Sequence, residues 1–431
     1  MKRAVASLML LAFAACGGPA RLPLEAGIGP SPQLPPAEHA LIPAMQVAKA
    51  IGWPAGLTPA AAPGLKVNGF ATGLDHPRWL YVLPNGDVLV AETSGPGTDP
   101  GPPGLKGYFF KKFKEKAGGA VPSANRITLL RDTDGDGVAE FRSTLLSGLR
   151  SPFGMTLLGN ELFIANADSL VAVHFTPGTT TISARPRLVT MLPAGRNHHW
   201  TKSLVASPDG RWLYVGVGSN SNVAENGMAI EQGRAAIWQI DPRTGASRIF
   251  AAGLRNPVGI AFNPWSGALW TAVNERDEIG SDLVPDYITS VRGGAFYGWP
   301  YSYYGQHVDV RVKPPRPDLV ARAIPPDYAL GPHVAALGLT FSHGQRLGPR
   351  FAQGAFVGEH GSWNRKPPSG YKVVFVPFGG AQPAGMPIDI LAGFISGGKA
   401  FGRPVGVQIA RDGSLLVADD VGNTVWRVSA A

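Results

Sequence analysis

Three stretches between residues 196 and 300 contain side chains that could do chemistry together. The stretch RNHHWTKSLVASPDG places His198 and His199 directly before an apolar segment. The stretch GLRNPVGIAFNP places Arg255 and Asn256 at the start of another, and VNERDEIGSDLVPDYITSVRGGAFYGWP is acidic and ends in glycines and aromatics. A histidine can act as a base, an arginine can stabilise an oxyanion and an oxygen-rich loop can bind a hard cation. The rest of the chain must bring these groups together.

A separate acidic loop, DTDGDGVAE, occupies residues 132–140. It resembles the first half of an EF-hand loop, but position twelve is Ser143 instead of glutamate. The loop could bind calcium as a structural ion far from the catalytic region, or it could be an Asp/Gly-rich hairpin turn. Both interpretations stay open. The candidate ligands are Asp132, Asp134, Asp136 and Glu140.

A pattern that recurs from about Leu65 to the end of the chain must position these residues. Each copy has an apolar strand, often entered through proline, then a glycine-containing turn and a second apolar strand. Six such copies, with room for two more strands in each, are typical of propeller blades. We expect an all-β fold over residues 65–431, a six-bladed β-propeller of four-stranded antiparallel sheets, because a β-sandwich would not explain the repeated Pro-Xaa-Gly. The copies begin at Gly73, Gly148, Ser203, Gly253, Val334 and Phe401.

The register of this repeat predicts one axial site. In a propeller the first strand of each blade starts at the central channel. The residues just before these strands should therefore converge on the channel. They are His76, Ser151, His198, His199, Asn256 and Arg403.

Composition favours an all-β fold over other classes of protein. The 431 residues include 56 glycines and 40 prolines, 44% are hydrophobic and only 16% are charged. This is too apolar for a disordered chain and too rich in turn formers for a helical one. The net charge is +9, and the nearest basic run, FFKKFKEK at residues 109–116, is interpreted as a solvated loop. We expect no nucleic-acid partner.

The N-terminus has the pattern of a secretory signal. MKRAVASLMLLAFAAC has a basic start, an apolar run and small residues before Cys16, the only cysteine. The last four residues resemble a bacterial lipoprotein box, although Phe13 stands where an aliphatic residue is usual. The resemblance implies a signal peptide over residues 1–15, lipidation of Cys16 and a location on the periplasmic side, with the lipid anchor as the only membrane contact. The alternative is ordinary signal cleavage without a lipid. Residues 16–64, rich in proline and alanine, are predicted to be a tether.

The chain from about Leu65 onward resembles the sorbosone and soluble glucose dehydrogenases. These are six-bladed propellers that carry pyrroloquinoline quinone (PQQ). The motifs are His199 five residues before Leu204, GLRNPVGIAFNP, NERDEIG followed by GGAFYGWP, VGEHGSWNR, and GRPVGVQIARDG followed by ADD. The WNR and YGWP variants look closer to the sorbosone dehydrogenase branch.

The resemblance implies roles for His199, Arg255 and Asn256. His199 matches the family's base, and Arg255 and Asn256 match the pair beside the reacting carbonyl of PQQ, where Arg255 would stabilise the developing oxyanion. His198 stands where the glucose-oxidising relatives have an aspartate that supports the base. What orients His199 is therefore left open.

Further cofactor contacts are implied closer to the C-terminus. Arg403 matches a family arginine on the cofactor, and Asp419 matches a family aspartate near it. A second family arginine is replaced by Val405. The family's cofactor-facing lysine has no clear match, and Arg365 is the best candidate by charge. A family glutamine near the substrate falls near Ser151, so the substrate cannot be carried over from glucose.

Calcium is the other cofactor that the resemblance implies. Family ligands are mainly backbone carbonyls of the loop that matches residues 276–278, and the carboxylates of Asp277 and Glu278 could add to them. Ligation by carbonyls tolerates the differing side chains here.

These features predict a PQQ- and calcium-dependent dehydrogenase that oxidises an aldose, a sorbosone-like aldehyde or a related sugar or alcohol. Its electrons would pass to an external cytochrome or quinone, since no CxxCH haem motif is present. Insertions at 93–125 and 301–333 are expected to line the channel mouth. Two alternatives are a calcium-dependent lactonase-type propeller hydrolase and a non-enzymatic ligand-binding propeller.

Overall fold

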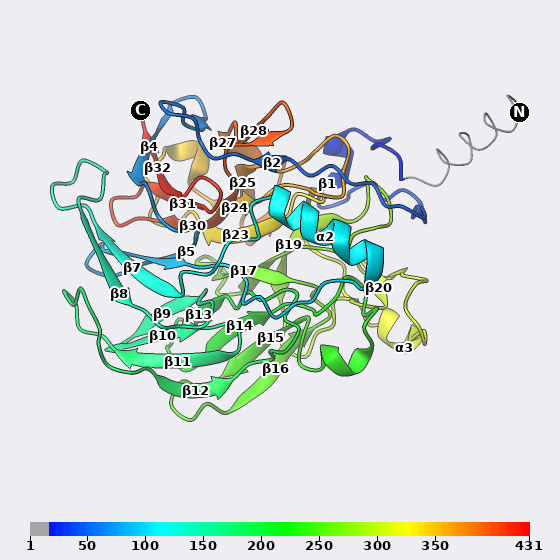
Figure 1. Ribbon diagram of the computed structural model, residues 1–431, viewed down its shortest axis with the longest axis horizontal. Helices are drawn as coiled ribbons and strands as arrows, with labels where there is room; N and C mark the ends of the chain where they lie inside the picture. Colours follow the sequence, from blue (N-terminus) through cyan, green and yellow to red (C-terminus); the bar gives the residue numbers. More distant parts are fainter. Residues whose placement is uncertain (1–16) are drawn as a thin grey trace, which may run out of the picture.

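The computed structural model describes residues 17–431 and is built almost entirely of antiparallel β-sheet (Figure 1). Six of the sheets each contain a run of four antiparallel strands, and in all but one of them the four strands lie in chain order. The first three are β5 (Pro77–Val82), β6 (Val88–Glu92), β7 (Arg126–Arg131) and β8 (Phe141–Leu146); β9 (Met155–Leu158), β10 (Glu161–Ala165), β11 (Ser169–His174) and β12 (Arg187–Met191); and β13 (Leu204–Ala206), β14 (Leu213–Val217), β15 (Ala236–Ile240) and β16 (Ser247–Ala252).

The other three sheets are built alike, except that the last takes its fourth strand, β4, from the start of the repeat region. They are β17 (Pro257–Phe262), β18 (Leu269–Val273), β19 (Pro285–Val291) and β22 (Tyr328–Pro332); β23 (Ala336–Phe341), β24 (Gly354–Glu359), β25 (Lys372–Gly379) and β27 (Ile388–Ala392); and β30 (Pro404–Ile409), β31 (Leu415–Asp419), β32 (Thr424–Ala430) and β4 (Leu65–Ala71). The prediction of an all-β fold with four-stranded antiparallel sheets is confirmed.

Short elements complete the described chain. The remaining strands are β1 (Ile28–Gly29), β2 (Lys49–Ala50), β3 (Ala60–Ala61), β20 (Ser302–Tyr303), β21 (His307–Val308), β26 (Gln382–Pro383), β28 (Ile395–Ser396) and β29 (Lys399–Ala400). The helices are α2 (Gly104–Lys116), α3 (Pro317–Val320) and the 3-10 turns η1 (Leu24–Gly27), η2 (Met228–Glu231) and η3 (Pro349–Phe351). Within residues 17–431, neither α-helix combines the length and apolar character that a membrane crossing requires.

The first strands of successive sheets lie against one another. β5, β17 and β30 begin at proline, which is tolerated there because the first residue of a strand need not donate to the ladder. In β17 and β30 a glycine two residues later permits close approach of the next sheet. A Cβ at Gly259 would lie 2.6 Å from the Leu337 carbonyl oxygen, and one at Gly406 would lie 2.9 Å from that of Arg78. The repeated Pro-Xaa-Gly is therefore a packing signal.

These contacts pass from each sheet to the next and return to the start. β9 contacts β5 and β13, β17 contacts β13 and β23, and β30 contacts β23 and β5. The last sheet joins the two ends of the repeat, because β4 pairs with β32 from Leu65 opposite Ala430 to Ala71 opposite Val425. The first strand of the repeat region thus holds the last one in place.

The segment that precedes the sheets differs from the predicted tether. β1 extends the sheet of β22, β2 pairs with β29 and β3 pairs with β27. Trp53 packs its ring 5.4 Å from those of Phe394 and Trp426. The tether prediction is corrected for residues 17–64, since sheet edges and an aromatic pocket supply partners that composition cannot reveal. The predicted signal peptide, 1–15, and Cys16 lie outside the described residues.

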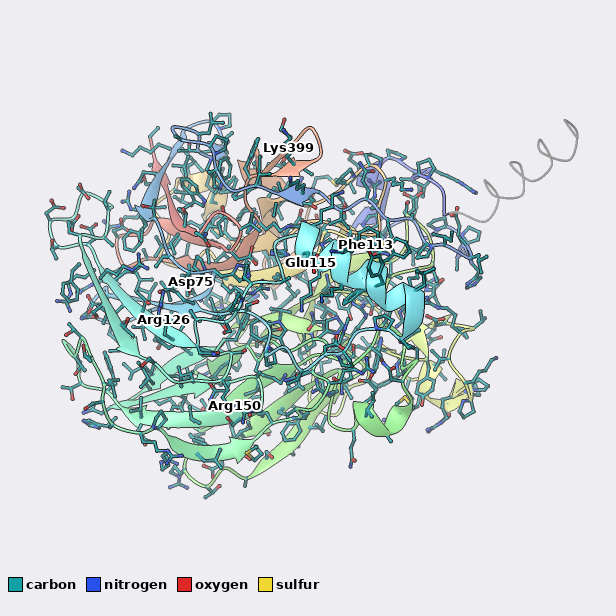
Figure 2. All side chains as sticks on the ribbon, in the orientation of Figure 1. Asp75, Phe113, Glu115, Arg126, Arg150 and Lys399 are labelled. Atoms are coloured by element: carbon teal, nitrogen blue, oxygen red, sulfur yellow. The ribbon has the colours of Figure 1, made fainter. Side chains whose placement is uncertain are left out.

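Helix α2 is a second difference. It includes the basic run at 109–116 that was interpreted as a solvated loop, and none of its residues is buried. In Figure 1 the helix crosses in front of the sheets, and Figure 2 shows Phe113 and Glu115 on it. The run is solvated as expected, but it is helical because it lacks breakers between Gly107 and Ala117.

Candidate active site

Of the residues predicted to converge, His199 and Asn256 lie in one group and His76 and Arg403 lie in a second, whereas Ser151 belongs to neither and donates its backbone N–H to the Asn125 side chain at 2.8 Å. In the first, a Cβ at Gly218 would lie 2.5 Å from the Cβ of His199 and would overlap the side-chain oxygen of Asn256. Gly218 thus lets the β14–β15 connection pass between these two side chains. His199 precedes β13 and Asn256 precedes β17, so adjacent sheets contribute to one place.

His199 is held in a single orientation. Its Nδ1 lies 2.9 Å from the backbone carbonyl oxygen of Ser219 and 3.0 Å from the Ser219 hydroxyl. Since a carbonyl can only accept, Nδ1 carries the proton and donates. Desolvation holds the pKa of His199 well below 6.5, and the positive charge of Arg255 and the nearby His198 lower it further. The ring is therefore neutral near neutral pH, with Nε2 as its basic nitrogen.

His198 does not orient His199. Its Nδ1 lies 2.6 Å from the Asp99 carboxylate, while the two histidine rings meet edge to face with centroids 4.7 Å apart. The question left open by the sequence is answered by Ser219, whose carbonyl does what an aspartate would otherwise do.

Arg255 is almost completely buried and its guanidinium is fully engaged. It donates to the Glu275 carbonyl oxygen at 2.6 Å, to the side-chain oxygens of Asn274 and Asn222 at 3.0 Å, and to Asp277 at 3.3 Å. These contacts fix a positive charge close to His199. Beside it, the side-chain oxygen of Asn256 is buried and has no hydrogen-bond partner within the described residues.

The oxygens of Asp277 are already paired with donors. Its carbonyl accepts from Asn222 at 3.0 Å and from Arg311 at 3.1 Å, and its carboxylate faces Arg255 and His333, the latter at 3.1 Å. The predicted calcium loop therefore offers no cluster of free oxygens at this residue.

The remaining ligand proposed for that loop points elsewhere. Glu278 forms an ion pair with Lys106 of α2 at 2.8 Å. The structure thus does not bring Asp277 and Glu278 together as a ligand set.

A second group surrounds Asp420. This carboxylate contacts His360 at 2.9 Å, His76 at 3.5 Å and Arg78. Burial alone would raise the pKa of Asp420, but His360, His76 and Arg78 together lower it strongly. Burial lowers the pKa of His360 to about 4 against the opposing effect of Asp420. The carboxylate is therefore ionised and the histidine neutral at neutral pH.

Arg403 closes this group from the last sheet. Its guanidinium is buried, donates to the Tyr371 hydroxyl at 3.0 Å and to the His360 carbonyl at 3.2 Å, and leaves Nε without a partner within the described chain. Arg78 has an unpartnered buried Nε as well. Burial lowers the pKa of Arg78 despite Asp420, and the charge of Arg403 lowers it further. Two guanidiniums thus lie close enough to repel, which is an arrangement that an anion would stabilise.

Asp419 does not face this group with free oxygens. Its carboxylate accepts four N–H groups, from the indoles of Trp53 and Trp426 and from the backbones of Arg403 and Gly422, at 2.7–3.0 Å. Burial raises its pKa to about 6. The predicted cofactor residue therefore anchors the segment that carries Arg403.

Arg365 lies away from both groups. It donates to the Pro367 carbonyl at 2.9 Å and lies 3.7 Å from Asp282, a residue that also receives the backbone N–H of Arg21. The structure therefore gives Arg365 a role in holding residues 17–25, and it does not bring Arg365 beside Arg403.

Aromatic residues connect the two groups. The guanidinium of Arg78 lies 5.6 Å from the ring centre of Trp200, which follows His199 in the chain. Phe110 of α2 lies 5.8 Å from the ring of His198 and 6.4 Å from that of Trp363. The 93–125 insertion therefore lies beside His198 and Trp363 through Phe110.

The acidic loop at 132–140 connects β7 and β8, on the outer side of its sheet. One oxygen from each of its four candidate residues lies within 4.8 Å of the others. Local hydrogen bonds also shape it, since Asp132 accepts the backbone N–H groups of Gly135 and Gly137 at 2.7 and 2.8 Å. The loop is both a hairpin turn and a cluster of carboxylates, so the two interpretations from the sequence are compatible. The candidate ligands are Asp132, Asp134, Asp136 and Glu140.

Comparison with known proteins assigns the chain to a family. Residues 123–287 and 320–431, well over half of the chain, match the TrAA12-like family. The chain belongs to the TrAA12-like family. The resemblance to PQQ-dependent sugar dehydrogenases that the motifs predicted is thereby confirmed.

Two relatives illustrate the range of this similarity. The TrAA12-like chain is 29% identical over 297 residues to an uncharacterized protein of Borreliella burgdorferi, covering 66% of this chain and 77% of that protein. It is 25% identical over 360 residues to the pyrroloquinoline quinone-dependent pyranose dehydrogenase of Coprinopsis cinerea, covering 73% and 44%. The chain thus matches less than half the length of the latter.

Solved structures show the same fold. The holo form of the pyranose dehydrogenase PQQ domain from Coprinopsis cinerea has a TM-score of 0.68 at 22% identity, covering 88% of this chain and 98% of that one. The calcium structure of a Trichoderma reesei carbohydrate-active enzyme of family AA12 has a TM-score of 0.70 at 19% identity, covering 90% and 99%. At these identities the likeness establishes architecture.

Sequence reasoning missed three residues of the candidate site. Arg78, Asp420 and His333 contribute charges or hydrogen bonds to the two groups. A signal existed for Arg78, which lies one residue after the Pro77 that begins β5, and for Asp420, which follows Asp419 in ADD. His333 had none, because it lies in an insertion, with positive φ of 59°.

Proposed function

We propose that this chain is a PQQ-dependent dehydrogenase that oxidises an aldose, a sorbosone-like aldehyde or a related sugar or alcohol. The observation that carries the proposal is the state of His199. It is neutral, its Nδ1 is committed to the Ser219 carbonyl, and Nε2 is left to accept a proton beside the buried charge of Arg255. Relatives named as PQQ-dependent pyranose dehydrogenases support the same activity.

The six sheets are proposed to be the blades of a six-bladed β-propeller. Three observations support this: the cyclic contacts of the first strands, the glycines that allow them, and the pairing of β4 with β32. In that arrangement both groups of site residues lie at the channel end of the blades.

The residues present fit an anionic, planar cofactor. Arg78 and Arg403 are two close guanidiniums with donors that lack protein partners, and they could hold carboxylates of PQQ. Arg78 would supply the charge that the family has at the position of Val405. When bound, PQQ supplies a two-electron acceptor that takes a hydride equivalent from carbon. Asn256 would be a neighbour of its reacting carbonyl.

The protein's own contribution is proton transfer and charge. His199 accepts the substrate hydroxyl proton at Nε2, and the resulting imidazolium keeps its Nδ1–H bond to Ser219. Arg255 stabilises negative charge that develops on oxygen nearby. Phe110 of α2 excludes water on the side of His198.

Calcium dependence is part of the proposal, with a changed location. The convergent carboxylates at 132–140 support a structural calcium site on the outer edge of a sheet. At residues 276–278 the paired oxygens of Asp277 do not fit a calcium ion, so we assign no ligand set there. Chelation should therefore lower thermal stability, and Asp134→Asn with Asp136→Asn should remove that effect of the chelator.

The setting of the enzyme is likewise proposed from the sequence. The signal pattern and Cys16 support a lipid-anchored location on the periplasmic side, and electrons would leave to an external cytochrome or quinone.

Titration of residues 17–431 with PQQ, with and without calcium, tests the proposal by absorbance. We expect saturable binding, bleaching on addition of an aldose or aldehyde, and for His199→Gln the same binding with turnover reduced by roughly 10²–10⁴-fold. Normal turnover of His199→Gln would remove it as the base. Absence of PQQ binding would overturn the dehydrogenase and favour the lactonase-type hydrolase or the non-enzymatic propeller.

A further inference from the structure

Helix α2 presents an apolar stripe to solvent. Leu105, Tyr108 and Phe109 follow one another at helical spacing, and their side chains are 72%, 59% and 48% exposed. No residue of the helix is buried, so these three apolar side chains contribute no buried core to the fold. An exposed stripe of this kind is usually covered by something in the working protein.

Lysines surround the stripe. Helix α2 carries five, against one glutamate, and its C-terminal end meets two more. A Cβ at Gly118 would lie 3.0 Å from Ala50 of β2, and β2 aligns Lys49 opposite Lys399 of β29. Figure 2 shows Lys399 beyond the end of α2 that carries Glu115. The seven lysines are Lys49, Lys106, Lys111, Lys112, Lys114, Lys116 and Lys399.

Acidic partners for this charge are few. Of these seven lysines, only Lys106 and Lys112 form ion pairs within the described residues, with Glu278 and Glu115. The other five lysines leave a positive surface around an apolar centre. A helix with exposed aromatics between lysines is the arrangement that anionic lipid surfaces attract.

A second apolar tip lies near the described start of the chain. Leu41 and Ile42 are 86% and 55% exposed, and the Ile42 carbonyl accepts the N–H of Gly17 at 2.7 Å. The same segment reaches Trp363 through the N–H of Gln46 at 2.7 Å, and Trp363 packs near Phe110 of α2. Hydrogen bonds and an aromatic contact thus link this tip to α2 and to Gly17.

We propose that this face, defined by Leu41, Ile42, α2, Lys49 and Lys399, docks on an anionic lipid surface. The apolar side chains enter the headgroup region and the lysines contact lipid phosphates. A lipid is favoured over an acidic protein because exposed apolar side chains of α2 lie among lysines, five of which have no acidic partner within the described residues.

Vesicle co-sedimentation of residues 17–431 tests this directly, since they contain every strand of the six sheets and lack the apolar leader. We expect binding to phosphatidylcholine vesicles that contain phosphatidylglycerol, weak binding to phosphatidylcholine alone, and loss at high salt. Tyr108→Ser with Phe109→Ser, and separately Lys111→Gln with Lys116→Gln, should each weaken binding by roughly tenfold.

Matched controls come from the opposite part of the molecule. Leu188 and Met191 of β12 are 54% and 59% exposed. Leu188→Ser with Met191→Ser therefore removes exposed apolar surface comparable to that removed by Tyr108→Ser with Phe109→Ser. Arg185→Gln with Arg243→Gln removes two positive charges, as Lys111→Gln with Lys116→Gln does. Both controls should bind like the unchanged chain, and circular dichroism should be identical for all variants.

Two results would overturn the docking face. One is failure of the unchanged chain to bind anionic vesicles at low salt, and the other is equal loss in the control variants. The assay needs neither PQQ nor a lipid on Cys16. A negative result therefore leaves sugar oxidation untouched, and failure of sugar oxidation leaves the docking face untouched.

Discussion

At the scale of single residues, a backbone carbonyl defines the proposed base. The Ser219 carbonyl fixes which nitrogen of His199 carries hydrogen, while desolvation and Arg255 keep the ring neutral. A carbonyl cannot be removed by a side-chain change, which makes this arrangement robust. The Ser219 hydroxyl can therefore be removed by substitution while the carbonyl that accepts from His199 stays in place.

The pH dependence of activity should reflect this site. Because the pKa of His199 is lowered, the base is deprotonated through neutral pH, and kcat/KM should fall only as pH drops below 6.5. The measurement is the pH profile of kcat/KM for PQQ-loaded enzyme. Ser219→Ala keeps the carbonyl, so it should keep the same profile. An acidic limb centred above 6.5 would contradict the assignment of His199 as the base.

At the scale of the strand, β24 ends on an unusual residue. Glu359 is 1% exposed, one of its carboxyl oxygens has no partner in the described chain, and burial raises its pKa to about 8. Lys372 opposes the shift, but Asp389 and Asp286 add to it. The folded protein therefore favours the protonated, neutral form of the Glu359 carboxyl group.

This raised pKa predicts a pH-dependent stability. The folded state binds a proton that the unfolded state releases near pH 4.5, so Glu359 costs stability progressively as pH rises toward about 8. Glu359→Gln should raise the free energy of unfolding at pH 8 by on the order of 1–3 kcal/mol, and by less at pH 5. Denaturant melts at both pH values measure this. Glu161→Gln, a control whose side chain is 45% exposed, should show no such difference, and an equal gain at both pH values would count against the explanation.

At the scale of the molecule, the pairing of β4 with β32 closes the set of sheets. Trp426 on β32 is buried, packs against Trp53 and donates to Asp419 at 3.0 Å. The last strand, the segment before the sheets and the anchor of Arg403 thus share one cluster. Stability and the cofactor region are coupled there.

Loss of this closure should affect the whole fold. Trp426→Ala should lower the free energy of unfolding by about 3 kcal/mol or more, because it leaves a cavity and an unpaired part of the Asp419 carboxylate. Trp265→Ala, at a side chain that is 39% exposed, should cost under about 1 kcal/mol. Thermal and denaturant melts measure both. If the two variants lost similar amounts of unfolding free energy, the pairing of β4 with β32 would not be a main source of stability.

The sequence by itself determined the strands, their turns and the register of the repeat. These depend on local chemistry, such as proline at the first residue of β17 and glycine where the neighbouring strand approaches. The same register placed His199 and Asn256 at the starts of adjacent first strands, which is why these two came together in space, while Arg403 joined the second group. The helical state of α2 was missed because an exposed basic run has no periodic core face.

Only the tertiary structure decided how the site residues are paired. The Ser219 carbonyl, the Asp420 group and the donors that occupy Asp277 come from segments far apart in the chain, and no local pattern specifies such contacts. The docking of residues 17–64 had the same origin, since it depends on sheet edges that exist only after folding. Local preference sets strands and turns, whereas hydrogen-bond partners are set by which chain segments meet.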